Sequence, residues 1–399
     1  MSNPSPYKIP ILDLRAQFAS IRDQVRSAVD KVTESQQFIL GPAVNQFETE
    51  MSVFLGCKHT VGVASGSDAL LLALMALGVG SGDAVITTPF TFFSTVSSIT
   101  RLGATPLFVD IDIDSNLLSA VKLEEFLRAR GKTTQGRTID AKTGAEIKAL
   151  LPVHLFGQMG AMEHLVQVAQ KYHLQIVEDV AQACGARLKI GGKEKFAGTI
   201  GALGCFSFFP SKNLGGFGDG GLVSADSEEL ATRLRMLRMH GESTKYHHEI
   251  TGLNSRLDSL QAAVLSVKLK YLDAWCESRI ARALTYRQLF LDSGLVGKQL
   301  PAIPSPTVGK SHVFNNYCIR ATHRDDLKQF LADAGIQSEI YYPLPLHLQK
   351  CFAELGYNQG DFPASEAAAG EILALPLYPE LTADQQVEVV DAIAQFYCS

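Results

Sequence analysis

Short apolar runs alternate with longer stretches of helical spacing between about residues 60 and 225. The runs HTVGVAS and DAVITTP each precede such a stretch, and TPLFVDI, IKALLPVHLF and LQIVEDVAQ continue the alternation. This rhythm predicts βαβ units and a mostly parallel sheet covered by helices, so the expected fold class is α/β. Residues 8–60 show helical spacing that is interrupted at LGP, residues 40–42.

Two segments depart from this rhythm. Residues 130–148 are polar, and we expect them to form a surface loop. Residues 257–290 carry helical spacing over a length sufficient to connect two domains. The strand and helix signals beyond them indicate a second, smaller α/β domain. We therefore expect an N-terminal segment at 1–35 that packs with the small domain, a large domain at 36–260 and a small domain at 261–399.

Composition narrows the class of protein. The 399 residues are 46% hydrophobic and 19% charged, with a formal net charge of −5, which is typical of a globular protein and argues against a nucleic-acid surface. The first residues lack the layout of a signal peptide, and no apolar run approaches the roughly 20 residues of a membrane helix. Seven scattered cysteines without a CxxC pair suggest neither disulfides nor a zinc site, so we expect no metal, no membrane partner and a cytoplasmic location.

Candidate ligand-binding residues follow the predicted strands, because open α/β sheets bind ligands beyond the carboxyl ends of their strands. The motif SGSD joins a strand to a helix, and there Gly66 and Ser67 suit either an anion at the helix N-terminus or an ordinary turn. Phe90, Phe92 and Phe93 follow another strand, where they indicate core packing or a ring that covers a flat ligand.

Charged residues follow two further strands. Glu178 and Asp179 close a fully apolar strand, so each carboxylate needs a partner, either in a salt bridge or in a cationic ring nitrogen of a ligand that Gln182 could also reach. His154 either lines the same site or is a hydrogen-bonded core residue. Lys212 follows the apolar run GALGCFSFF, and such surroundings favour the neutral amine, which attacks aldehydes. An anion cradle, an aromatic lid, an acid and a lysine in this order suit pyridoxal 5′-phosphate (PLP).

The chain resembles the DegT/DnrJ/EryC1/StrS family of PLP-dependent nucleotide-sugar aminotransferases, which have the aspartate aminotransferase fold (fold type I). The resemblance rests on VASGSDALLLAL, VEDVAQACGA, SFFPSKNLGGFGDGG and RMHGESTKYHHEITGLNSRLDSLQAAVL, in this order along the chain. It implies a large PLP-binding domain with a mostly parallel sheet between helices, a smaller C-terminal α/β domain, and a homodimer with composite active sites.

The resemblance also implies a role for each candidate residue. Lys212 would bond covalently to PLP, Asp179 would face the pyridinium nitrogen and Phe92 would stack on the ring. Gln182 would contact the phenolic oxygen of the cofactor. The phosphate would be held by Gly66, Ser67, Ser207 and Asn254 of the partner subunit.

The implied reaction takes the amino group of L-glutamate to a keto group, at position 3, of a nucleotide-linked sugar for surface polysaccharide or amino-sugar biosynthesis. The expected acceptor is UDP-2-acetamido-2-deoxy-3-oxo-glucuronate, contacted by Arg256 of the partner subunit together with Tyr341 and Tyr342. His247 is a further candidate for substrate contact. Because Tyr341 stands where such relatives have histidine, a neutral dTDP-3-keto-6-deoxyhexose is an alternative. A regulatory subunit without turnover is another, which the presence of Lys212 disfavours.

Overall fold

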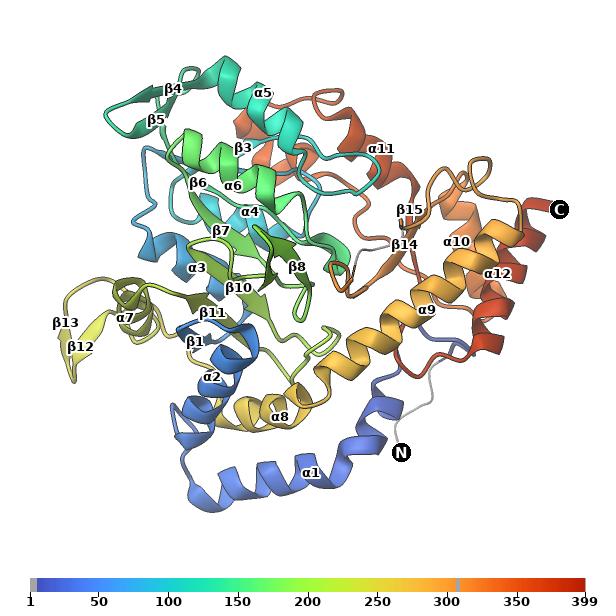
Figure 1. Ribbon diagram of the computed structural model, residues 1–399, viewed down its shortest axis with the longest axis horizontal. Helices are drawn as coiled ribbons and strands as arrows, with labels where there is room; N and C mark the ends of the chain where they lie inside the picture. Colours follow the sequence, from blue (N-terminus) through green and yellow to red (C-terminus); the bar gives the residue numbers. More distant parts are fainter. Residues whose placement is uncertain (1–5, 306–308, 399) are drawn as a thin grey trace.

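A computed structural model describes residues 6–305 and 309–398, and its centre is a twisted, mostly parallel sheet (Figure 1). In spatial order the main strands are β1 (His59–Val63), β11 (Gly221–Ala225), β10 (Leu203–Ser207), β7 (Gln175–Asp179), β6 (Glu146–Leu150), β2 (Asp83–Thr87) and β3 (Thr105–Phe108). Neighbouring strands from β10 to β3 are parallel, and β11 runs antiparallel to β1 and β10. The parallel sheet that the sequence predicts is confirmed.

Helices cover this sheet. They are α2 (Pro42–Leu55), α3 (Gly66–Ala76), α4 (Phe93–Thr100), α5 (Ala120–Arg130), α6 (Met162–Lys171), α7 (Glu228–Leu237) and α8 (Ser259–Leu269). The apolar helix α3 packs against β10 and β11, and its side chains Leu70, Leu72 and Leu74 are buried. A helix that is apolar on nearly all sides is stable only when it is surrounded by protein, so α3 is a central element of the core.

The polar segment at 130–148 is not a loop, so this expectation is wrong. It forms a hairpin of β4 (Gly131–Thr134) and β5 (Arg137–Asp140), and β5 pairs with the edge of β6. Gln135 and Gly136 at its tip both have positive φ, 49° and 74°, which is the geometry of a tight two-residue hairpin turn. An exposed hairpin needs few apolar residues, and polarity alone therefore did not distinguish it from a loop.

The helical segment at 257–290 is confirmed as two helices, α8 and α9 (Leu272–Asp292), and α9 leads to a second group of elements (Figure 1). These are β14 (Tyr317–Arg320), α10 (Arg324–Asp333), α11 (Pro363–Glu371), β15 (Ile372–Leu375) and α12 (Ala383–Cys398). This group has an apolar core of its own, which includes Tyr286, Phe290, Tyr317 and Leu327. The division of the chain at residues 35 and 260 stays a prediction.

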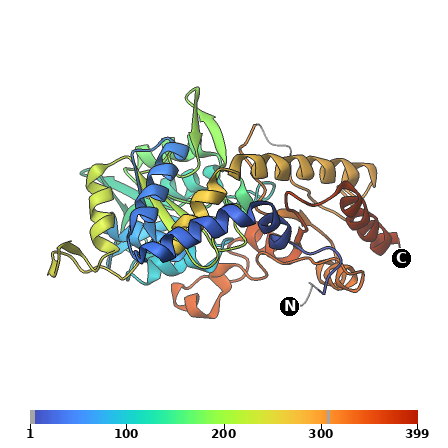
Figure 2. The ribbon, with the colours of Figure 1, turned by 90° about the horizontal axis from the view of Figure 1, so that it is seen from below.

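The N-terminal segment contacts both groups of elements. Helix α1 (Leu14–Ser35) lies along α8, where Ile21 and Val25 pack against Val264 (Figure 2). Ahead of the helix, Ile9 forms a parallel bridge with Ile336 beside α10. Within residues 6–305 and 309–398, no helix combines the length and apolar character needed to cross a membrane.

The tight contact at Gly204 in β10 gives a stability test. A Cβ atom at this position would overlap the Cα atom and the carbonyl oxygen of Gly198, and neither backbone atom can move without shifting its own segment. We expect Gly204→Ala to lower the free energy of unfolding by about 3 kcal/mol, as overpacking of a core does. Gly80→Ala is the matched control, because a Cβ there meets nothing within 4 Å. Equal thermal unfolding midpoints for the two variants would contradict the prediction.

Candidate active site

A cavity of about 470 Å³ opens at the edge of the sheet where β1, β7 and β10 end. Parallel strands bring their carboxyl ends to the same edge, so residues far apart in the sequence meet there. The cavity is lined by nine of the predicted residues: Gly66, Ser67, Phe92, Asp179, Gln182, Ser207, Lys212, Tyr341 and Tyr342.

One end of the cavity is the N-terminus of α3. Ser65 caps this helix, and the first backbone N–H groups of a helix lack partners within it and carry partial positive charge. Gly66 is needed for the fit, because a Cβ there would lie 2.6 Å from the Cβ of Ser207 at the end of β10. The hydroxyl oxygens of Ser67 and Ser94 lie 2.6 Å apart. Backbone N–H groups and hydroxyls converging at a helix N-terminus suit a phosphate.

The cavity also holds the carboxylate of Asp179. Its Oδ2 accepts a hydrogen bond of 2.9 Å from the Thr95 hydroxyl, and its Oδ1 accepts one of 3.1 Å from the Ala181 backbone N–H. Burial raises the pKa of Asp179 above its usual value, and these hydrogen bonds and the Lys212 charge offset this only in part. Within the part of the chain that the structure describes, Asp179 makes no salt bridge, so a cationic ring nitrogen would supply the missing partner.

Lys212 enters the cavity from the loop that follows β10. Burial lowers the pKa of its amine to about 8, and the negative charge of Asp179 opposes this shift. The loop is held from outside, since Asn213 Nδ2 donates to the Val313 carbonyl at 3.1 Å and the Phe217 N–H donates to Gln261 Oε1 at 2.7 Å. A fixed amine with a lowered pKa has a substantial neutral fraction near pH 7 to 8, which a nucleophile requires.

A mixed polar and aromatic wall closes one side. Gln182 Nε2 donates to the Tyr342 hydroxyl at 3.3 Å, and Gln182 Oε1 accepts from the Phe156 N–H at 2.6 Å. The Phe92 side chain is 55% exposed, and its ring centre lies 5.9 Å from that of Tyr342. An exposed aromatic ring at the mouth of a cavity is available to cover a flat ligand.

The model of the DegT/DnrJ/EryC1/StrS aminotransferase family matches residues 19–394. The chain belongs to this family. A curated relative named pleiotropic regulatory protein, from Geobacillus stearothermophilus, is 45% identical over 98% of both chains. A UDP-N-acetyl-3-dehydro-α-D-glucosamine 3-aminotransferase from Acidithiobacillus ferrooxidans is 41% identical over 96% of this chain and 97% of its own. The crystal structure of S. venezuelae DesV with a ketimine intermediate has a TM-score of 0.86 and 38% identity, covering 97% of this chain and 98% of DesV.

Membership of this family makes the chain a PLP-dependent aminotransferase of fold type I. The cavity fits that cofactor, since an anion cradle, an amine of lowered pKa and a buried carboxylate without an ion pair surround one space. Within residues 6–305 and 309–398 there is no cluster of three His, Cys, Asp or Glu side chains that could hold a metal ion.

Glu178 and His154 lie behind the cavity rather than in it. Successive residues of a strand point to opposite faces, so Glu178 points away from the side that Asp179 occupies. Glu178 Oε2 lies 2.9 Å from His154 Nε2, and the carboxylate also accepts backbone N–H groups from Gly198, Ile200 and Gly201. Both side chains are buried, and of the two alternatives for His154 the structure supports the core histidine.

Three predicted residues do not line the cavity of their own chain: Asn254, Arg256 and His247. Asn254 is exposed and forms an antiparallel bridge with Met239. His247 is exposed in the hairpin of β12 (Glu242–Thr244) and β13 (His247–His248), which projects beyond α7 in both views (Figures 1 and 2).

Sequence reasoning missed several lining residues, namely Thr91, Ser94, Ser211, Asp219, Asn315 and Asn316, and also Thr95 behind them. The hydroxyl residues of α4 carry no sequence signal beyond an ordinary helix start. Asn315 and Asn316 lie in a different part of the chain from the strand ends, so the strand-end rule does not reach them.

The lowered pKa of Lys212 can be tested in the apoenzyme. Competitive acetylation with trace acetic anhydride should show the amine becoming reactive with a midpoint near pH 8, well below the 10.5 of an ordinary lysine, because burial favours the neutral form. Asp179→Asn should move the midpoint lower still, since the carboxylate raises the pKa of Lys212. Nα-acetyl-lysine amide, which keeps a free side-chain amine, is the internal reference in the same mixture. A midpoint near pH 10 for Lys212 would contradict the prediction.

Proposed function

We propose that this aminotransferase moves the amino group of L-glutamate to the C3 keto group of a nucleotide-linked sugar. The observation that carries the proposal is the placement of Lys212, Asp179 and the α3 N-terminus around one cavity with open space beside the amine. The 41% identical relative, named as a 3-aminotransferase, supports position 3.

Each side chain has a distinct task in this proposal. When bound, PLP supplies a reactive carbonyl carbon and a ring that accepts electrons from the substrate carbon. Lys212 Nζ would hold the cofactor between turnovers and would move a proton between two carbon atoms during the reaction. Asp179 would hold the proton on the ring nitrogen. Gln182 would contact the phenolic oxygen, and Phe92 would cover the ring and exclude water.

The remaining half of the site is proposed to come from a second copy of the chain. Ser255 is fully buried, and its Oγ accepts a hydrogen bond of 3.2 Å from the Ala64 N–H. In an extended segment its two neighbours therefore point the other way, and Asn254 is exposed and Arg256 partly exposed. Asn254 of the partner subunit would complete the phosphate site, and Arg256 of the partner subunit would face the substrate. The exposed rings of Phe209 and Phe217 support burial against a partner.

The acceptor we favour is neutral. Lys212 is the one cationic side chain among the described residues that line the cavity, and Tyr341 offers a phenol whose pKa burial raises to about 12. A phenol donates a hydrogen bond without bringing positive charge. The uronate UDP-2-acetamido-2-deoxy-3-oxo-glucuronate is the second candidate, because Arg256 of the partner subunit could hold a carboxylate through two parallel hydrogen bonds.

Two further features complete the proposal. The name of the Geobacillus relative suggests regulation, but a lysine of lowered pKa in the cofactor cavity supports turnover in this chain.

A cytoplasmic location is also proposed, and the free state of all seven cysteines supports it.

A panel of keto sugars tests the function. With glutamate as donor, the enzyme should aminate a neutral 3-keto nucleotide sugar more efficiently than UDP-2-acetamido-2-deoxy-3-oxo-glucuronate and should leave the 4-keto isomers unchanged, as measured by mass spectrometry of the sugar product. Borohydride reduction and peptide mapping should place the pyridoxyl mass on Lys212, and Lys212→Ala should retain the fold without transamination. Efficient use of a 4-keto isomer would refute position 3, and a pyridoxyl mass on another lysine would refute the role of Lys212.

Mixed dimers test the composite site. Lys212→Ala and Asn254→Ala subunits carrying different tags can be co-expressed and purified as heterodimers. One site then collects both substitutions and the other collects neither, so we expect about half of the wild-type activity from one intact site in two. A heterodimer of two differently tagged Lys212→Ala subunits is the inactive control. Inactivity of the mixed heterodimer would show that each site is built from one chain.

A further inference from the structure

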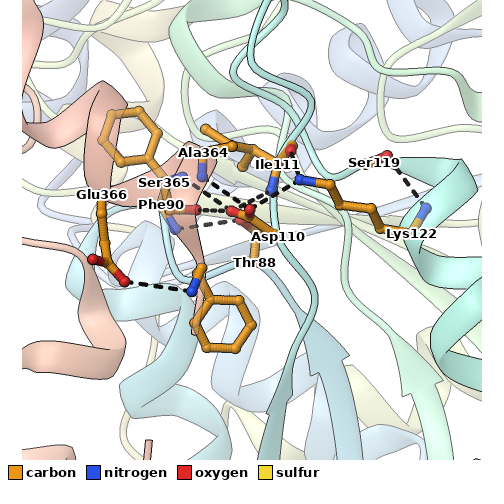
Figure 3. Close-up of polar contacts among 10 residues, drawn as sticks. Thr88, Phe90, Asp110, Ile111, Ser119, Lys122, Ala364, Ser365 and Glu366 are labelled. Atoms are coloured by element: carbon orange, nitrogen blue, oxygen red, sulfur yellow. Dashed lines mark hydrogen bonds and ion pairs between the residues drawn. The ribbon is translucent and has the colours of Figure 1, made fainter. Parts of the chain in front are cut away.

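Helix α11 begins without a cap from its own sequence. Pro363 occupies its first turn, and the preceding residue, Phe362, has no side-chain oxygen to accept the free N–H groups of the helix. The acceptor comes instead from Asp110, which lies 254 residues before Ala364 in the chain. Asp110 Oδ2 accepts from the Ala364 N–H at 3.0 Å, and its Oδ1 accepts from the N–H and the hydroxyl of Ser365 at 3.0 and 2.6 Å (Figure 3).

The large domain holds Asp110 firmly. Its Oδ1 also accepts from the Ile111 N–H at 2.9 Å, and Lys122 Nζ lies 2.9 Å from Oδ2, on the side opposite α11 (Figure 3). The carboxyl is only 7% exposed, and burial alone would raise its pKa. The hydrogen bonds from Ser365 and Lys122 more than offset this and lower the pKa of Asp110, so the carboxylate is charged at neutral pH. A negative charge at a helix N-terminus is favourable.

The other end of α11 is held by the small domain. Arg324, the first residue of α10, is buried, and its Nη1 donates to the carbonyls of Ala369 and Ile372 at 3.1 and 2.8 Å. A positive charge at the C-terminus of a helix is favourable for the same electrostatic reason. Helix α11 is therefore fixed by an aspartate of the large domain at its start and by an arginine of the small domain at its end.

The segment 341–362 runs from the cavity to α11. Tyr341 and Tyr342 line the cavity at its start, and its middle packs on α4. The Phe352 ring stacks on that of Phe93 with a centre distance of 5.4 Å. The backbone N–H of Leu346 donates to the carbonyl of Pro89 at 2.7 Å. The segment thus forms a wall that rests on the large domain.

Glu366, in the first turn of α11, closes the end of this segment. Its Oε1 accepts from the Gly360 N–H at 2.8 Å and lies 3.1 Å from His347 Nε2. His347 is buried against the ring of Phe362. The position of α11 therefore determines where the second half of the segment lies, and Asp110 fixes the α11 N-terminus together with the packing of Ala364 on the core of the large domain.

We propose that Asp110 is a positioning residue for the acceptor site. By capping α11 across the domain boundary, it holds the segment 341–362 on the large domain and so sets the wall formed by Tyr341 and Tyr342. The proposal rests on the function proposed above only in taking these two tyrosines as part of the acceptor site.

The test compares holoenzymes of Asp110→Ala and Asp110→Asn with the control Asp112→Ala. Asp112 lies in the same turn but is exposed and bonds Ser115, not α11. We expect Asp110→Ala to speed hydrogen exchange in peptides covering 343–366 and to raise KM for the keto sugar about tenfold, the size of effect that loss of a helix cap produces. Asparagine keeps one of the two acceptor oxygens, so Asp110→Asn should give intermediate hydrogen exchange and an intermediate KM. Asp112→Ala should match wild type in both.

Unchanged exchange in 343–366, or faster exchange spread evenly over both domains, would overturn the proposal. Faster exchange in 343–366 with unchanged KM would leave α11 capped by Asp110 but refute its role at the acceptor site. If Asp110→Ala does not fold, Asp110→Asn decides by the same criteria. An enzyme that aminates none of the sugars would refute the proposed function. Hydrogen exchange is measured without an acceptor sugar, so its result would still decide whether Asp110 holds the segment 341–362.

Discussion

The active site depends on a carboxylate and an amine that burial drives toward their neutral forms in one cavity. Burial raises the pKa of Asp179 and lowers that of Lys212 to about 8. The sheet creates this arrangement, because β7 and β10 are parallel neighbours with Asp179 opposite Cys205, and the loop after β10 carries Lys212. In the proposed function, a cationic aromatic ring would offset the unfavourable burial of the Asp179 carboxylate, so cofactor binding and local electrostatics would favour the same arrangement.

Helix α4 contacts two of the groups that line the cavity. The Thr95 hydroxyl donates to Asp179, and the Ser94 hydroxyl lies 2.6 Å from that of Ser67 at the start of α3. The helix has only eight residues, which is too short to be stable without tertiary contacts. The segment 341–362 supplies part of those contacts through Phe352. Through α4, the segment 341–362 therefore supports the Thr95 hydroxyl that donates to Asp179.

The sequence predicts those parts of the site that follow directly from strand ends. Gly66, Asp179 and Lys212 each stand just beyond an apolar run, and a parallel sheet brings such positions together whatever the rest of the fold does. Thr95 and Asp110 could not be found in this way, because their partners lie 84 residues or more away and nothing local marks a hydroxyl or carboxylate for a distant acceptor or helix. The hairpin at 130–148 was missed for the converse reason: its turn signal, Gln-Gly, is weak, and its strands are too polar to resemble core strands.

In the proposed function, the residues that select the acceptor sugar lie in other parts of the fold than the residues that carry out the reaction. The lining of one chain's cavity offers a diphosphate-linked sugar a single cation among the described residues, Lys212, and the proposed function assigns that amine to the cofactor. A nucleotide diphosphate needs further donors, so recognition has to draw on residues that approach from outside the cavity. In the proposed dimer these are the segment around Arg256 and the exposed hairpin with His247, both surface elements of the subunit that donates them. Substitutions of the partly exposed Arg256 or the exposed His247, unlike substitutions of the buried Ser255 between Asn254 and Arg256, leave the buried contacts of Asp179 and Lys212 in place.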